Sequence, residues 1–165
     1  MKLLLFGTLL SVSSAFLIET GILSCPYLSI KVREFDYLWV YKDHCYLFSP
    51  IKFRYPLAEK YCKNMSGTLA MPKTEDENSE YIKALEEFKI KEPAWIGISD
   101  RAKEGEFVYA DGSKLKINKF NTRINPLLGF LQDCVAFDPS SGLWHRYMCD
   151  STPLTSARRP FICQF

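Results

Sequence analysis

The side chains in this sequence that could do chemistry are few, and most of them are cysteines. Six cysteines occur, and all of them lie beyond residue 24. An even number in a chain with an export signal predicts three disulfides, although six cysteines allow fifteen pairings. A zinc site would need close pairs such as CxxC or HxxxH, and neither spacing occurs. The cysteines are therefore predicted to be structural.

The catalytic repertoire is correspondingly small. The two histidines, His44 and His145, stand far apart in the sequence, and the patterns HExxH and GxSxG are absent, as is a phosphate-binding glycine loop. We therefore predict that the protein is not an enzyme. The enzymatic alternative is a secreted hydrolase that uses His145 as its base. A free cysteine in the mature chain would reopen nucleophilic chemistry, because it would undo the disulfide assignment.

The first fifteen residues predict a signal peptide. Lys2 precedes an apolar stretch, and small residues follow up to Ala15. The apolar part is too short to span a membrane, and no later stretch reaches the roughly 18 apolar residues of a transmembrane helix. Residues 16–24 are expected to form a short amino-terminal segment. The sequence thus predicts a secreted, extracellular chain without a transmembrane anchor.

The charge of the chain argues against a nucleic-acid partner. The formal charge of +2 falls to +1 when Lys2 leaves with the leader. The nearest basic runs, Arg158-Arg159 and the lysines at 114, 116 and 119, are too sparse for a phosphate-binding surface. We interpret them as solvated faces.

The elements that must position these side chains are organised around residues 94–98, a short apolar segment between charged flanks. Such a segment is typical of a strand that is buried on both faces, and a buried turn of helix is the alternative. Gly97 has no side chain, so a second backbone can approach it closely. Trp95 is expected to fill the centre of the core.

Two helices are predicted before this strand. Pro56 opens the first helix, Leu57 leads its apolar stripe, Cys62 faces inward and Gly67 ends it. The second helix begins after Thr74, which forms a capping box with the glutamate three residues on. Its apolar stripe is expected to hold Tyr81, Ile82, Leu85 and Phe88.

The rest of the chain has the pattern of strands. Hairpins are expected within residues 25–48 and 134–149, and a last strand at 160–165. Residues 107–112 are expected to fold back on themselves. Residues 113–133 lack a regular pattern but stay apolar, and an irregular loop of this length is usually functional.

In their order along the chain, these residues resemble the C-type lectin-like domain. The resemblance covers residues 25–165, and around residues 99–112 it is strongest to the collectin and tetranectin branches. The matching residues are Cys25-Pro26, Trp39 with Tyr41, Cys45-Tyr46-Leu47-Phe48, Leu69-Ala70-Met71-Pro72, Trp95-Ile96-Gly97-Ile98, Glu104-Gly105 with Phe107, Asp133-Cys134, Trp144, Cys149 and Phe161-Ile162-Cys163.

The resemblance implies an α+β fold with two helices, two small antiparallel sheets and a long irregular loop. It also implies three disulfides, Cys25–Cys45, Cys62–Cys163 and Cys134–Cys149. The expected organisation is a signal peptide at 1–15, a short segment at 16–24 and a C-type lectin-like domain at 25–165.

The family's usual chemistry is sugar binding through calcium, which needs six to eight oxygen ligands. The resemblance implies a Glu-Pro-Asn or Gln-Pro-Asp tripeptide in the long loop, a Glu before the next Cys, and an Asn-Asp pair after a Trp. Here the corresponding residues are Ile124-Asn125-Pro126-Leu127, Gln132 and His145-Arg146. Arg146 places a cation where a carboxylate is needed. We therefore predict no primary calcium site and no cofactor.

An auxiliary calcium site of some members is matched better. Asp100, Glu104 and Asp133 match three of its carboxylates, and Leu127 falls near a missing fourth. Three carboxylates could hold a weak ion. Equally, Glu104-Gly105 is a structural element of the fold.

The function favoured by the sequence is a secreted recognition module that binds an extracellular protein or glycan without calcium. The alternative is a calcium-dependent carbohydrate-binding lectin of the innate recognition type with an unconventional site. Asn64-Met65-Ser66 is a glycosylation acceptor pattern, which predicts a glycoprotein modified at Asn64.

The ligand is predicted to bind at the long loop. Ile117 and Phe120 are expected to be structural, whereas the later apolar residues are too many for one loop to bury on itself, which leaves an apolar patch rimmed by positive charge. The predicted ligand-binding residues are Arg123, Asn125, Leu127, Phe130, Gln132, His145 and Arg146.

Overall fold

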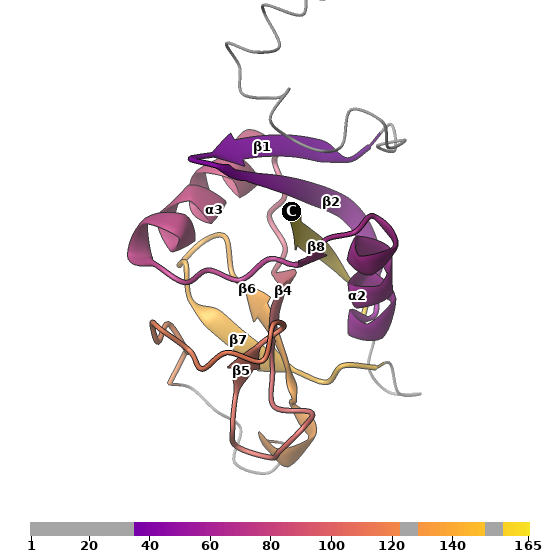
Figure 1. The fold of residues 1–165 in the computed structure, drawn as a ribbon, viewed down its shortest axis with the longest axis vertical. Coiled ribbons are helices and arrows are strands. Elements are labelled where there is room, and N and C mark those ends of the chain that lie inside the picture. Colours follow the sequence, from indigo (N-terminus) through magenta and orange to yellow (C-terminus); the bar gives the residue numbers. More distant parts are fainter. Residues whose placement is uncertain (1–34, 123–128, 151–156) are drawn as a thin grey trace, which may run out of the picture.

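The computed structural model describes residues 35–122, 129–150 and 157–165. Within these ranges two α-helices lie on opposite sides of a layer of strands (Figure 1). The elements are β1 (Tyr37–Tyr41), β2 (His44–Phe53), α2 (Tyr55–Asn64), β3 (Thr68–Leu69), α3 (Glu75–Glu87), β4 (Ala94–Ser99), β5 (Val108–Tyr109), the 3-10 turn η2 (Gly129–Leu131), β6 (Cys134–Phe137), β7 (Trp144–Tyr147) and β8 (Arg159–Gln164).

Strand β4 forms the centre of the molecule, as predicted. Its residues from Ala94 to Ile98 are buried, and the Trp95 indole N–H donates a hydrogen bond of 2.8 Å to the carbonyl oxygen of Phe53. A Cβ added at Gly97 would lie only 2.5 Å from the carbonyl oxygen of Leu69. A second backbone therefore does approach this glycine, and the helical alternative for the segment is wrong.

The strands are joined into one mixed sheet, whereas two small antiparallel sheets were expected. The strand order is β1-β2-β8-β4-β6-β7, with β3 paired to β8 and β5 paired to β4. The link between the two halves is a parallel pairing of β4 with β8, at Trp95 and Phe161. Both strands are apolar and buried. They can therefore pair in the interior, where β8 and β4 would otherwise be the edge strands of two separate sheets.

Helix α2 begins at Tyr55, with Pro56 in its first turn, and its inward face differs from the prediction. Tyr55, Ala58 and Cys62 are buried, whereas Leu57 is 44% exposed. The predicted apolar stripe is therefore wrong at Leu57, although its other members pack in or against the core and the inward position of Cys62 is confirmed.

The end of α2 also differs from the prediction. The chain turns at Ser66, which has a left-handed backbone with a φ of 60°, and not at Gly67. Gly67 is needed for another reason: a Cβ there would lie 2.3 Å from the ring of Phe165. The glycine therefore allows the carboxyl-terminal ring to pack against the backbone.

Helix α3 follows its predicted signals. The Thr74 hydroxyl accepts a hydrogen bond of 3.2 Å from the Glu77 N–H, and the Glu77 carboxylate accepts one of 2.9 Å from the Thr74 N–H. This is the predicted capping box. Tyr81 and Leu85 are buried against the main core, and Ile82 and Phe88 pack at its margin.

Two of the three predicted disulfides lie within the described residues, and both are confirmed. Cys62 is bonded to Cys163, and Cys134 to Cys149. Cys25 lies outside the described residues, so the pairing Cys25–Cys45 stays a prediction.

The antiparallel pairs β1–β2 and β6–β7 form the two predicted hairpins. The segments predicted as signal peptide, 1–15, and as short amino-terminal segment, 16–24, fall outside the described ranges. Inside those ranges, no helix combines the length and the apolar character that crossing a membrane requires.

Candidate functional site

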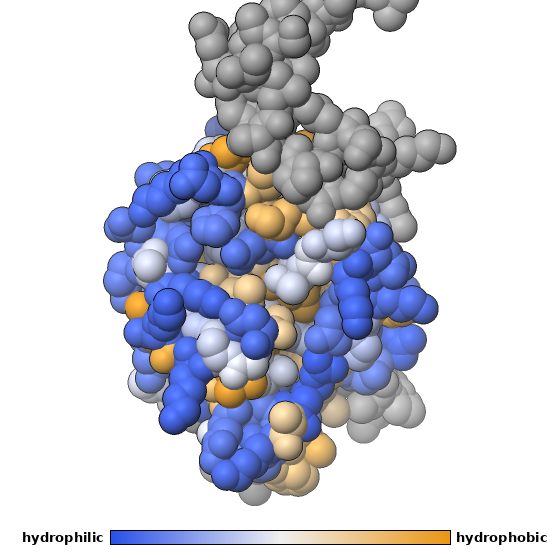
Figure 2. Space-filling view, viewed as in Figure 1, coloured by the Kyte–Doolittle hydropathy of each residue, from blue (hydrophilic) through white to orange (hydrophobic). Residues whose placement is uncertain are grey.

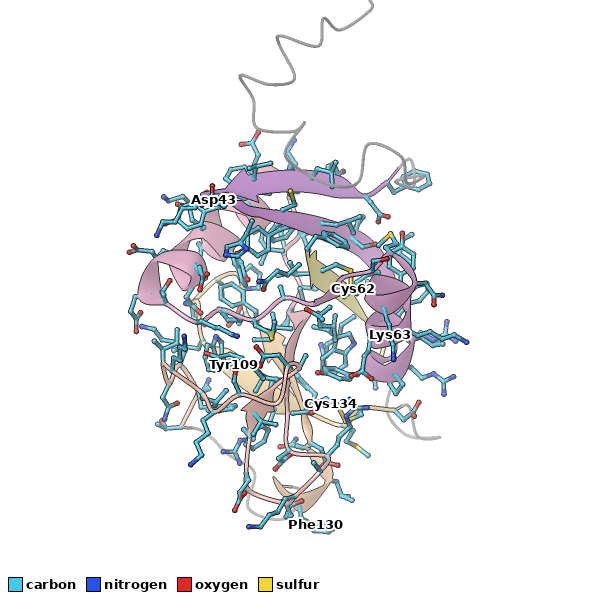
Figure 3. The ribbon with its side chains drawn as sticks, in the orientation of Figure 1. Asp43, Cys62, Lys63, Tyr109, Phe130 and Cys134 are labelled. Carbon is cyan, nitrogen blue, oxygen red and sulfur yellow. A yellow bond between two sulfur atoms is a disulfide. The ribbon has the colours of Figure 1, made fainter. Side chains whose placement is uncertain are left out.

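The long loop between β5 and β6 lies at the end of the molecule opposite to β1. Figure 3 shows Phe130 at this end, and Figure 2 shows apolar atoms there, in orange tones. Turn η2 leaves 63% of Phe130 and 42% of Leu131 exposed. We call these two residues the apolar tip.

The base of the loop is fixed to β7. The Trp144 N–H donates a hydrogen bond of 2.8 Å to the Lys119 oxygen, and the Asn121 N–H donates one of 2.8 Å to the Trp144 oxygen. The rings of Phe120 and Trp144 meet edge to face, with their centres 5.6 Å apart. Phe120 and Ile117 both pack against the main core, which confirms their predicted structural role.

Arg146 lies on β7, two residues after Trp144, and its guanidinium packs over two aromatic rings. Its guanidinium carbon lies 4.5 Å from the ring centre of Phe107 and 5.0 Å from that of Phe120. Its Nε is buried and has no hydrogen-bond partner in the part of the chain that the structure describes. Attraction between a cation and two ring faces holds the positive charge in place.

His145 contacts a different group of side chains. Its Nε2 lies 3.2 Å from the Asn121 Nδ2 and 3.6 Å from an Asp138 carboxylate oxygen. The site thus brings His145 close to the base of the loop, but not as a metal ligand.

The surroundings of Asp138 bear on the hydrolase alternative. The hydroxyls of Ser140 and Ser141 each donate a hydrogen bond of 2.8 Å to the Asp138 carboxylate. Burial alone would raise the pKa of Asp138, but the hydrogen bonds from these serines lower it on balance. Both serine hydroxyls thus donate to Asp138, and the described residues show no hydrogen bond from either of them to His145.

The described residues at the primary calcium positions do not fit calcium. Gln132, which is half-buried, offers a neutral amide, and its neighbours in the predicted set, His145 and Arg146, supply an imidazole and a fixed cation. Calcium needs several anionic oxygens. The other predicted ligand-binding residues, Arg123, Asn125 and Leu127, lie outside the described residues.

Two of the three carboxylates predicted for the auxiliary site do come together. The Asp100 N–H donates a hydrogen bond of 3.1 Å to the Asp133 carbonyl oxygen, and an Oδ1 of each side chain is buried without a hydrogen-bond partner among the described residues. Burial raises the pKa of Asp133, and the nearby charge of Asp100 raises it further.

The third carboxylate, Glu104, is exposed and does not join them. No group of three or more His, Cys, Asp and Glu side chains in the described ranges could hold a metal ion. The other Asp100 oxygen accepts a hydrogen bond of 2.9 Å from the Gly105 N–H. This bond fits the structural interpretation of Glu104-Gly105, in which the carboxylate closes a turn.

Two residues of this face were missed by sequence reasoning. Phe107 was expected only as part of a strand, and its contact with Arg146 joins residues far apart in the chain. Asn121, which contacts His145, was not singled out at all. Neither contact has a signal in local periodicity or spacing.

Comparison with known proteins places this geometry in a known context. The sequence model of one family, the Lectin C-type domain, matches residues 52–165. A tetranectin-like protein of Carcharhinus perezii is 34% identical over 124 residues, which cover 73% of this chain and 70% of that protein. Collectin-10 of Gallus gallus is 37% identical over 116 residues, which cover 67% of this chain but only 38% of that protein.

Solved structures share the fold at lower identity. The carbohydrate-recognition domain of the mouse scavenger receptor C-type lectin is 23% identical, with a TM-score of 0.66 over 78% of this chain and 92% of that one. Human lithostathine is also 23% identical, with a TM-score of 0.67 over 81% and 98%. A calcium-independent type II antifreeze protein is 18% identical, with a TM-score of 0.63 over 78% and 90%.

Proposed function

Because the chain belongs to the family of C-type lectin domains, we propose that it is a secreted recognition module that binds an extracellular glycan or protein without calcium. The observation that carries this proposal is the fixed position of Arg146. Its guanidinium is held over Phe107 and Phe120, where it repels a divalent cation. Recognition on this face must then use side chains alone.

The apolar tip supports the same proposal. Phe130 and Leu131 are exposed, whereas Phe120, at the start of the same loop, packs against the core. Exposed apolar groups that lie next to each other suit binding, because a ligand that covers them removes apolar surface from water. The fold itself is compatible with loss of calcium, since one solved protein that shares it is described as calcium-independent.

Secretion, glycosylation and the absence of catalysis are parts of the same proposal. The two described disulfides suit an oxidising, extracellular compartment. Asn64 is exposed at the end of α2, which leaves it accessible to the enzyme that would attach a glycan. The serine hydroxyls donate to Asp138, which leaves His145 without a serine nucleophile among its described hydrogen-bond partners and favours recognition over hydrolysis.

A second candidate is a calcium-dependent lectin of the innate recognition type with an unconventional site. The buried, unpartnered oxygens of Asp100 and Asp133 favour it, because such oxygens are what calcium binds. Those two carboxylates would hold the ion, and calcium would supply a positive charge that ties the loop to β4. The described set of donors stays well short of six to eight oxygens.

The test is a screen of the secreted protein against glycans and cell surfaces, once with calcium and once with chelator. We expect the same ligands in both conditions. Phe130→Ala should then weaken binding of an identified ligand by about 1–3 kcal/mol, because exposed aromatic anchors carry much of the affinity. Leu57→Ala is the matched control, since Leu57 is exposed on α2 and lies outside the loop.

Loss of binding in chelator would contradict the proposal and favour the second candidate. Unchanged affinity in Phe130→Ala would contradict the role of the apolar tip. Arg146→Ala, a second variant at a predicted ligand-binding residue, does not separate an effect on binding from an effect on folding. The side chain packs on Phe107 and Phe120, so its removal should disturb the fold as well as the ligand.

A further inference from the structure

A second concave surface lies beside α2. It is an open groove of about 650 Å³ between α2 and the segment that leads into β3, with Ala110 from the turn after β5 at its floor. Figure 2 shows a paler band between the blue surface of α2 and the blue surface to its left. No predicted residue of the long-loop site lines this groove.

The walls of the groove are held together before any ligand arrives. The disulfide Cys62–Cys163 ties α2 to β8, and Leu69 of β3 pairs with Cys163 on the same strand. The Ala110 N–H donates a hydrogen bond of 2.9 Å to the Gly97 carbonyl oxygen, which fixes the turn against β4. A preformed groove saves a ligand the cost of ordering it.

The charge on the α2 wall is positive and uncompensated. Lys60 and Lys63 lie three residues apart on one face of the helix, both are exposed, and neither forms an ion pair within the described residues. The acidic residue of the lining, Glu59, has its carboxylate bound 2.7 Å from a guanidinium nitrogen of Arg101. Arg101 is itself held over the ring of Tyr55, at 4.9 Å.

The remaining lining is mixed. Ser66 and Thr68 add two exposed hydroxyls to the lining, and Ala110 adds a small exposed apolar surface, whereas Leu69 is buried beneath it. A volume of about 650 Å³ falls within the range of small-molecule sites, which is roughly 300–1,000 Å³. Cations, hydroxyls and a small apolar surface together are what an anionic sugar needs.

We propose that this groove binds a saccharide that carries carboxylate or sulfate groups. The anionic group pairs with Lys60 and Lys63, the hydroxyls of Ser66 and Thr68 bond to sugar oxygens, and the ring lies against the methyl group of Ala110. The groove contains neither residue of the apolar tip, so the two surfaces can bind ligands independently.

The experiment is a calorimetric titration of the mature protein, in chelator and at low salt, with two probes. One is a heparin-derived tetrasaccharide, and the other is its desulfated counterpart, which keeps the carboxylates. Binding of both probes would assign the site to carboxylates, and binding of the sulfated probe alone would assign it to sulfate. Affinity should fall as salt rises, because the lysines are exposed.

Lys60→Gln/Lys63→Gln should lower the affinity by about tenfold, as expected when two exposed charges are lost. Lys114→Gln/Lys116→Gln removes the same charge from exposed positions outside the groove and should keep the wild-type affinity. Phe130→Ala should keep it too, which separates this site from the long-loop site. Thermal unfolding of each variant verifies its fold.

Three results would overturn the proposal. In the first, Lys60→Gln/Lys63→Gln binds the probe with the affinity of the wild type. In the second, Lys114→Gln/Lys116→Gln loses as much affinity as Lys60→Gln/Lys63→Gln does. In the third, neither probe binds at low salt. The second of these would show general attraction of an anion to a basic surface. None of them bears on recognition by the apolar tip, which is tested with its own ligand.

Discussion

Asp133 is a carboxyl group in a place where its charge is costly. Burial raises its pKa, the charge of Asp100 raises it further, and its Oδ1 has no hydrogen-bond partner among the described residues. The carboxyl group of Asp133 therefore binds a proton more tightly in the folded state than in the unfolded chain. Its contribution to stability is fully present below the ordinary carboxyl pKa and is lost as the pH rises through the raised value.

Asp133→Asn should accordingly raise the midpoint of thermal unfolding at pH 7 in chelator, because the amide carries no charge to bury. The gain should shrink below about pH 4, where the wild-type carboxyl is protonated as well. Thermal melts of both proteins across this range measure it.

Asp111→Asn is the control with the opposite sign. Hydrogen bonds from Lys73 and Ser113 lower the pKa of Asp111 to about 2, so its charge favours folding at neutral pH. This variant should lose stability at pH 7, and the loss should fade as the pH approaches 2. A less stable Asp133→Asn protein at pH 7 in chelator would mean that the Asp133 carboxylate has a partner that stabilises it.

At the scale of single elements, the hydrogen bonds that cap a helix were predictable from the sequence, but the face of a helix that packs against the core was not. The capping box of α3 follows from Thr74 and Glu77 alone, because both partners lie within one turn. The face of α2 depends on what the helix packs against. Tyr55 is drawn inward by the ring of Trp95, at 5.4 Å, and this rotates Leu57 toward solvent.

The two helices therefore give contrasting predictions for one substitution. Leu57→Ala in α2 should change the free energy of unfolding by no more than about 0.5 kcal/mol, because that side chain is largely in water. Leu85→Ala in α3 should cost about 2–5 kcal/mol, because Leu85 is fully buried and its loss leaves a cavity. Urea unfolding of both variants measures the difference. Similar costs would place Leu57 in the core after all.

At the scale of the whole molecule, what could be predicted from the sequence depended on how far apart the interacting residues lie. The close approach at Gly97 was expected, since a glycine in a buried strand leaves room for a second backbone. The resemblance to a family implied the distant bridge Cys62–Cys163. The stack of Arg146 on Phe107 could not be predicted, because it depends on the path of the intervening chain.

The two described disulfides should differ in what they contribute. Cys62–Cys163 spans 101 residues and Cys134–Cys149 spans 15. In the chain-entropy model, loops of these sizes correspond to about 4.7 and about 3 kcal/mol. Replacing both cysteines of the long bridge with alanine should thus lower the free energy of unfolding by about 1.7 kcal/mol more than the same change at the short bridge. Guanidinium unfolding of the two double variants compares them, and the reverse order would contradict the entropic account.

The pairing of β8 with β2 has a mechanical consequence. Phe165, beside β8, donates its N–H to the Cys45 oxygen on β2, so the carboxyl end of the described domain lies against its amino-terminal hairpin, opposite the apolar tip (Figure 1). Tension applied between residues 35 and 165 is carried by the β1–β2–β8 ladder, and the bond between Cys62 and Cys163 stops it from extending further into the domain. The load bypasses β6 and β7, so the hydrogen bonds that join Trp144 to Lys119 and Asn121 carry none of it.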